Sequence, residues 1–155
     1  MRQELVQSAK IDYRFSYQDA LVTGHNGLGE YLLIIHPEGD VYNKVMNIEE
    51  RFYKDFGREK PVDIKPHIVL ASFLSSEEME ETLIRWIYRI SGSQQSFSVT
   101  LNNFSGFLSH TIYLRILDHR PFQNLLTQLK AIEPYVIANG GHTVKLMWPH
   151  LGIAR

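Results

Sequence analysis

The chain has 155 residues, of which 44% are hydrophobic and 21% charged, and its formal net charge is −1. This length and composition are typical of one globular domain, or of two small lobes that share a cleft. A nearly neutral chain is poorly suited to binding long duplex DNA, which requires many lysines and arginines against phosphates, whereas a local basic cleft could still bind a short nucleotide.

The chain contains no cysteine, which excludes disulfides and thiolate metal sites and gives no sign of secretion. No apolar run approaches the roughly 20 residues that a membrane span requires. The N-terminus lacks the apolar core of a signal peptide. We therefore expect a cytoplasmic protein without membrane partners.

In chain order, the first predicted elements are two strands and a helix. Apolar and polar residues alternate over residues 11–18, which predicts a half-buried strand, and residues 24–29 form a predicted turn. The apolar run at 31–35 predicts a central strand buried on both faces. A helix is predicted over residues 40–57, ended by Gly57. Its predicted buried stripe is Val41, Val45, Ile48, Phe52 and Phe56.

The second helix is predicted to start at a capping box formed by Ser75 and Glu78 and to end at Gly92. The acidic cluster at residues 77–81 suits the positive end of the helix dipole, which explains it better than a metal site does. The predicted buried stripe is Met79, Leu83, Trp86, Ile87 and Ile90.

Alternation predicts two further strands, at residues 97–102 and 110–116, joined by a turn. A third helix is predicted to begin near Pro121, and Pro134 is predicted to end or kink it. The predicted order is strand, helix, strand, helix, strand, strand, helix, strand. His110 is expected to be a structural residue on an apolar strand face. The histidines expected on the surface are His25, His36, His119 and His142.

One pattern occurs twice in the chain. Residues 66–71 read Pro-His-Ile-Val-Leu-Ala, and residues 149–154 read Pro-His-Leu-Gly-Ile-Ala. Both follow the form Pro-His-aliphatic-x-aliphatic-Ala, with the histidines, His67 and His150, 83 positions apart. A repeat this detailed predicts that the two copies form one functional site.

Each copy is predicted to be a short strand, because proline is tolerated at the first position of a strand. Successive side chains of a strand point to opposite faces. His67 would therefore share a face with Val69, and His150 with Gly152. The aliphatic residues between them would pack on a core, and the histidines would face water or a ligand.

These motifs resemble the signature of the two-histidine (2H) phosphoesterase superfamily, in its bacterial 2′-5′ RNA ligase-like and cyclic phosphodiesterase branch. That signature is two copies of His-x-Thr/Ser-hydrophobic. The resemblance covers roughly residues 30–155 and departs from the signature at both hydroxyl positions, which are Val69 and Gly152. The flanking segments that carry it further are Lys65-Pro66-His67, Ile153-Ala154-Arg155 and residues 109–114, Ser-His-Thr-Ile-Tyr-Leu.

The resemblance implies a fold and a domain organisation. Relatives are α+β proteins with two pseudo-symmetric lobes, whose antiparallel sheets line a central cleft and whose helices lie outside. Residues 1–155 would form one such bilobal domain, with residues 1–29 as an N-terminal extension. Relatives usually continue with a strand after the second motif, so residues 11–23 are predicted to supply that strand in a permuted order; the rival is a truncated chain with an open edge.

The resemblance also implies a reaction that two histidines can perform. Breaking a phosphodiester requires one oxygen to lose a proton and another to gain one, and imidazole suits both steps because its unperturbed pKa is about 6.5. His67 and His150 would be the acid–base pair, without a metal or another cofactor. The expected substrate is a nucleotide or RNA terminus with a 2′,3′-cyclic phosphate or a 2′-5′ linkage.

In the family, the Thr or Ser hydroxyls bind phosphate oxygens, which Val69 and Gly152 cannot do through their side chains. Two lost hydrogen bonds to a charged group are worth about 3–6 kcal/mol, or roughly 10²–10⁴ in rate. The exposed backbone N–H of Gly152 compensates in part. Tyr113 and Arg115 are candidates for base stacking and phosphate contact, and Trp148 is either a stacking wall or, with some preference, a core residue.

Two other functions stay open from the sequence. Loss of both hydroxyls favours a decayed relative that binds a phosphorylated nucleotide or RNA terminus without turnover. A histidine metal site is the weaker alternative, because no histidines or acids occur at ligand spacing. Turnover of a cyclic phosphate separates the enzyme from the binding module, and elemental analysis would detect a metal.

Overall fold

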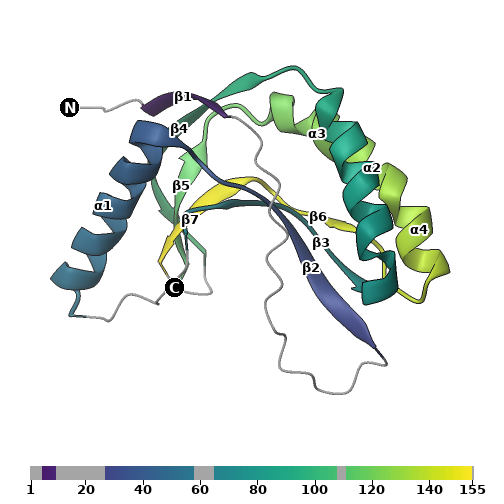
Figure 1. Ribbon diagram of the computed structural model, residues 1–155. Helices are drawn as coiled ribbons and strands as arrows, with labels where there is room; N and C mark the ends of the chain where they lie inside the picture. The colour runs from purple at the N-terminus through teal and green to yellow at the C-terminus, as the bar shows by residue number, and fades with distance from the viewer. Residues whose placement is uncertain (1–4, 10–26, 58–64, 108–110, 155) are drawn as a thin grey trace.

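The computed structural model describes residues 5–9, 27–57, 65–107 and 111–154 (Figure 1). Within them the chain forms an α+β fold with one antiparallel sheet. The strands are β1 (Leu5–Ala9), β2 (Leu28–Ile35), β3 (Ile68–Ser76), β4 (Phe97–Gly106), β5 (Ile112–Ile116), β6 (Lys145–Leu146) and β7 (His150–Ala154). The helices are α1 (Gly39–Asp55), α2 (Glu80–Gly92), α3 (Arg120–Leu129) and α4 (Glu133–Ala138), with 3-10 turns at Glu77–Met79 and Lys130–Ile132.

The two strands that carry the repeated motif are neighbours in the middle of this sheet. The strand order is β1-β4-β5-β7-β3-β2, with β6 also paired to β3, and every pair is antiparallel. The prediction of an α+β fold with antiparallel pairing is confirmed. Residues 11–23, predicted to add a strand, lie outside the described residues. The edge strand next to β4 is β1, which the sequence did not predict.

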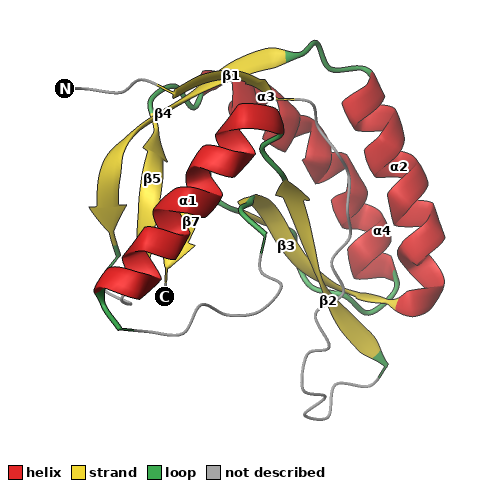
Figure 2. Ribbon diagram, turned by 60° about the vertical axis from the view of Figure 1, so that its left-hand side comes forward, coloured by secondary structure: helices red, strands yellow, loops and turns green. Residues whose placement is uncertain are grey.

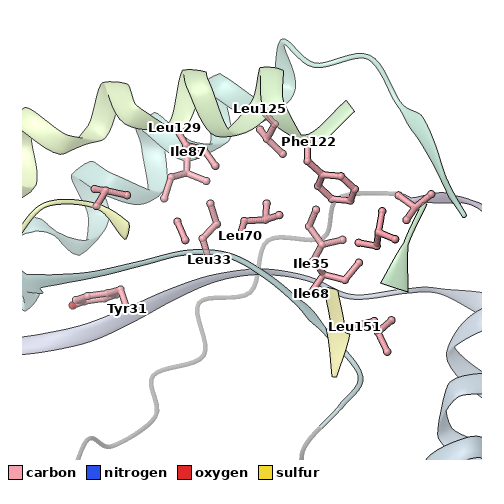
Figure 3. Close-up of a cluster of buried hydrophobic side chains, with 14 of the residues drawn as sticks. Tyr31, Leu33, Ile35, Ile68, Leu70, Ile87, Phe122, Leu125, Leu129 and Leu151 are labelled. Atoms are coloured by element: carbon pink, nitrogen blue, oxygen red, sulfur yellow. The ribbon is translucent and has the colours of Figure 1, made fainter. Parts of the chain in front are cut away.

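The helices divide into two groups around the sheet. In Figure 1 α2, α3 and α4 lie together over β2 and β3, whereas α1 lies apart from them, alongside β5 and β7. Figure 2 likewise shows α2 and α4 side by side and α1 apart from this pair. Apolar side chains fill the space between the sheet and the helices (Figure 3). Those at most 2% exposed include Ile35, Leu70, Ile87, Phe122, Leu125, Leu129 and Leu151. None of the helices in the described ranges has the length and hydropathy to cross a membrane.

Several sequence predictions for the elements are wrong in detail. Ser75 does not cap a helix: it lies in β3, fully buried, and its hydroxyl has no hydrogen-bond partner among the described residues. The α1 stripe is shifted, because Phe56 is 67% exposed while Glu49 and Tyr53 are buried. These two residues continue the spacing of four that begins at Val41 and Val45.

Three more predictions, about the positions of strands and the ends of helices, are corrected by the structure. β2 is an edge strand of the described sheet, not a central one. β4 continues through the predicted turn to Gly106, because an irregularity at Asn103, with φ of 51°, lets pairing with β5 resume. Pro134 lies in the first turn of α4, after the 3-10 step that ends α3, where proline's missing N–H is tolerated.

Candidate functional site

His67 and His150 lie on the same face of the sheet. Ile68 pairs directly with Leu151 across β3 and β7, and both side chains are buried, so this pair faces the core. Because side chains alternate, the neighbouring positions face the other way. Continuing the register by one residue puts His67 across from Gly152 and His150 across from Val69. The two histidines are therefore diagonal neighbours, whose Cα atoms are about 7–8 Å apart and whose Cβ atoms are somewhat closer. We call this surface the histidine face.

The two imidazoles are oriented by the same local interaction. The Nδ1 atom of His67 is 2.8 Å from the carbonyl oxygen of Lys65, and the Nδ1 atom of His150 is 2.8 Å from that of Trp148. A carbonyl oxygen accepts, so Nδ1 carries the proton and donates in both cases. In the neutral ring Nε2 is then the basic nitrogen. Each ring is held by the backbone two residues before it, with Nε2 left for chemistry.

Both motif strands also contain a β-bulge at the same position of the motif. On β3, Val69 pairs with Ile34 and Ala71 with Leu33, so Leu70 is the extra residue. On β7, Gly152 pairs with Tyr113 and Ala154 with Ile112, so Ile153 is the extra residue. Leu70 and Ile153 both come three residues after the motif histidine. The repeat in the sequence is thus also a repeat in backbone geometry.

The predicted substrate contacts Tyr113 and Arg115 lie on the histidine face. They pair with Gly152 and His150 respectively, and the residue between them, Leu114, is buried against Leu151. The aligned positions form two rows across the sheet. The first row is His67, Gly152, Tyr113 and Ser105, and the second is Ile34, Val69, His150, Arg115 and Asn102.

Phe107, which the sequence did not suggest, completes an aromatic group around His150. Its ring stacks on Tyr113 with centroids 4.4 Å apart, and both rings lie 5.0 Å from His150 in edge-on geometry. Phe107 is 42% exposed, so the stack reaches the surface. No local pattern signals this contact, because Phe107 follows the end of β4 and meets His150 only through the fold.

Trp148 is not a core residue, which corrects the preferred reading of the sequence. Its side chain is 67% exposed and packs against His119, with ring centroids 4.2 Å apart and the rings tilted by 34°. His119 was expected on the surface, but it is half-buried, and its Nδ1 atom is buried without a hydrogen-bond partner. The indole is left open beside the second motif.

His36 was also expected on the surface and is instead part of the site. It is half-buried, its Nδ1 atom is 2.9 Å from the carbonyl oxygen of Pro66, and its ring lies 6.3 Å from that of His67. His25 and His142 were also expected on the surface. His142 is exposed, as expected. His25, like His110, lies outside the described residues.

The charges near the site favour an anion. The two rows contain imidazoles and the exposed guanidinium of Arg115, and none of their members is acidic. The nearby carboxylate of Asp118 is paired with Arg120 at 2.8 Å, and hydrogen bonds from that residue lower the pKa of Asp118 to about 2. Across the described ranges, no three His, Asp or Glu side chains are grouped so as to hold a metal ion.

No protein-family model, curated protein or solved structure matches the chain. The site combines two imidazoles held by equivalent hydrogen bonds, a guanidinium across from His150, and the exposed aromatic rings of Phe107 and Trp148.

Proposed function

We propose that this protein is a metal-independent phosphodiesterase of the two-histidine type. It would act on 2′,3′-cyclic phosphates or 2′-5′ linkages of nucleotides or RNA ends. The observation that carries the proposal is the diagonal placement of His67 and His150 on one sheet face, each with Nδ1 bonded to the carbonyl two residues earlier. Two lobes that meet where β3 pairs with β7, and a cytoplasmic location, are part of the same proposal.

The reaction would use the two Nε2 atoms, which have no hydrogen-bond partner among the described residues. One neutral imidazole takes the proton of an attacking water as its oxygen bonds to phosphorus, and the other, protonated, gives its proton to the leaving ribose oxygen. The P–O bond to the ribose breaks, and both histidines end with exchanged protonation states. In-line displacement needs one group on each side of phosphorus, which a pair on neighbouring strands supplies.

Residues around His67 and His150 would bind the substrate. Arg115, across from His150, is placed to neutralise charge on the phosphate oxygens. The Phe107–Tyr113 stack and the exposed indole of Trp148 offer aromatic faces to nucleobases, since stacking tolerates any base. A Cβ atom added at Gly152 would meet no heavy atom within 4 Å, so this face of the sheet is open beside the second motif.

A second candidate is a binding protein without turnover. It is favoured by Val69 and Gly152, which lie across from the two histidines and offer no hydroxyl to a phosphate. Such a protein would bind the same phosphorylated nucleotides through the imidazoles and Arg115 without breaking a bond.

Hydrolysis of the four nucleoside 2′,3′-cyclic phosphates, and of a 2′-5′-linked dinucleotide, in EDTA tests the proposal. His67→Ala and His150→Ala should each lower turnover by about 10²-fold or more, because each removes a proton-transfer group. His142→Ala, on an exposed loop, is the matched control and should leave turnover unchanged. Binding without wild-type turnover would support the second candidate, and neither binding nor turnover would refute both.

A further inference from the structure

The strands that flank the motif strands pair with them in matching registers. On one side, Val69 pairs with Ile34 and Ile68 with Ile35. On the other side, Gly152 pairs with Tyr113, Leu151 with Leu114, and His150 with Arg115. Continuing the first register by one residue puts His36 across from His67. His36 therefore occupies, beside the first histidine, the position that Arg115 occupies beside the second.

The His36 side chain is held in that position. Its Nδ1 atom is 2.9 Å from the carbonyl oxygen of Pro66, the residue immediately before His67. Its ring is half-buried and meets that of His67 at 70°, with centroids 6.3 Å apart. Nδ1 is thus used by the backbone, as in both motif histidines, and among the described residues Nε2 of His36 has no hydrogen-bond partner.

An anion would stabilise this arrangement. Two protonated imidazoles this close repel each other, and a negative group bound between them removes the repulsion. The row that contains both rings holds no carboxylate to do so from the protein side. Phosphate would meet His36 and His67 on one strand pair and His150 and Arg115 on the other.

His36 and Arg115 are placed to supply hydrogen-bond donors in place of the missing motif hydroxyls. Val69 and Gly152 cannot donate from their side chains, so donors on the flanking strands must hold the phosphate oxygens. We propose that His36 is a third functional histidine, which in its protonated form donates from Nε2 to a non-bridging phosphate oxygen, as Arg115 would on the opposite side. This inference rests on the proposed function, because it assumes a phosphate bound between the motif histidines.

Two substitutions separate binding by Nε2 from support of the fold by Nδ1. His36→Asn keeps an amide nitrogen near the position of Nδ1, so the bond to Pro66 is retained, and leaves nothing at Nε2. His36→Gln puts an amide nitrogen near Nε2. Affinity for inorganic phosphate and for a nucleoside 2′-monophosphate, by calorimetry, should fall about 10- to 100-fold in the Asn variant. It should fall less in the Gln variant, and not at all in the control His142→Asn.

Imidazole NMR on the wild-type protein gives an independent test. Titration with phosphate should shift the His36, His67 and His150 ring signals and leave that of His142 unmoved. Shifts of His67 and His150 without a shift of His36, or wild-type affinity in His36→Asn, would overturn the inference and leave the proposed function standing. No shift of any of the three, and no phosphate binding, would refute the proposed function and this inference together.

Discussion

Replacing Gly152 with threonine should raise both stability and activity. The residue is half-exposed on β7, its backbone does not have positive φ, and a Cβ atom added there would meet no heavy atom within 4 Å. Glycine in a strand is about 0.5–1 kcal/mol less favourable than alanine, and threonine is a strong strand former. We expect the free energy of unfolding to rise by about that amount, measured by urea denaturation.

The effect on activity comes from the hydroxyl. At position 152 the side chain lies on the histidine face, across from His67, where it can donate to a phosphate oxygen. A hydrogen bond to a charged group is worth about 1.5–3 kcal/mol, which corresponds to roughly 10- to 100-fold in kcat/KM for a cyclic phosphate. Val69→Thr, at the equivalent position of the first motif, should add a similar factor.

Gly152→Val is the matched control, because valine has the shape of threonine without the hydroxyl. It should share the gain in stability and leave the rate at the wild-type level. Equal rates for the Thr and Val variants would show that phosphate does not bind beside position 152. Destabilisation by both variants would refute the register that puts this residue on an open face.

Three further predictions test the fold, the aromatic surface and the electrostatics. Gly141→Ala should destabilise the protein by about 1–3 kcal/mol or more in thermal denaturation, because a Cβ atom there would collide with backbone oxygens of β3 and α4. Gly92→Ala is the control and should not destabilise the protein, because a Cβ atom at Gly92 would lie in open space. Equal melting temperatures of the two variants would contradict this packing. Trp148→Ala should leave the melting temperature near wild type, since the side chain is 67% exposed, and raise KM about 5- to 100-fold through lost stacking; an unchanged KM would remove Trp148 from the site. Hydrogen bonds from Arg120 lower the pKa of Asp118 from 3.8 to about 2, so the ion pair stabilises the protein above about pH 4 and this stabilisation is lost as pH falls through about 2. NMR titration of the Arg120→Gln variant should show the pKa of Asp118 rising toward 3.8. An unchanged pKa would contradict this cause.

The strands that carry the site could be predicted because period-two alternation is a local property. Ile68 and Leu70 on one side, and His67 and Val69 on the other, can be assigned to faces without knowing any partner. The element order around them follows from helix periodicity and turn residues. Which strands become neighbours depends on contacts between distant segments, so the pairing of β3 with β7 appears only in the structure.

The site residues that were missed share a physical cause. His36 ends a continuous apolar run, so no alternation indicated its face, and its position depends on the register of β2 against β3. Phe107 reaches His150 through the pairing of β4 with β5. Trp148 was preferred as core because large aromatics are usually buried, yet His119 covers only one side of it. Ser75 has the spacing of a capping box, but the strand continues through it.

The matched bulges explain why a strand can carry both the site and the core. If β3 alternated without interruption, Ala71 and Phe73 would share the face of His67 and Val69. The extra residue, Leu70, reverses the alternation, so Phe73 is buried while His67 stays on the open side. On β7 the extra residue is Ile153, directly before the last residue of the strand.

This geometry also explains the form of the repeated motif. An aliphatic residue followed directly by alanine, as in Leu70-Ala71 and Ile153-Ala154, breaks the period of two that a regular strand would show. A bulge reverses the alternation of side chains, so a strand that contacts the core both before and after the bulge has two adjacent apolar residues there. The aliphatic-Ala pair is therefore the signature of the bulge, and the histidine three residues earlier is held on the opposite face because of it. Deleting Leu70 should then bury His67 or expose Phe73, and it should abolish phosphate binding together with much of the stability.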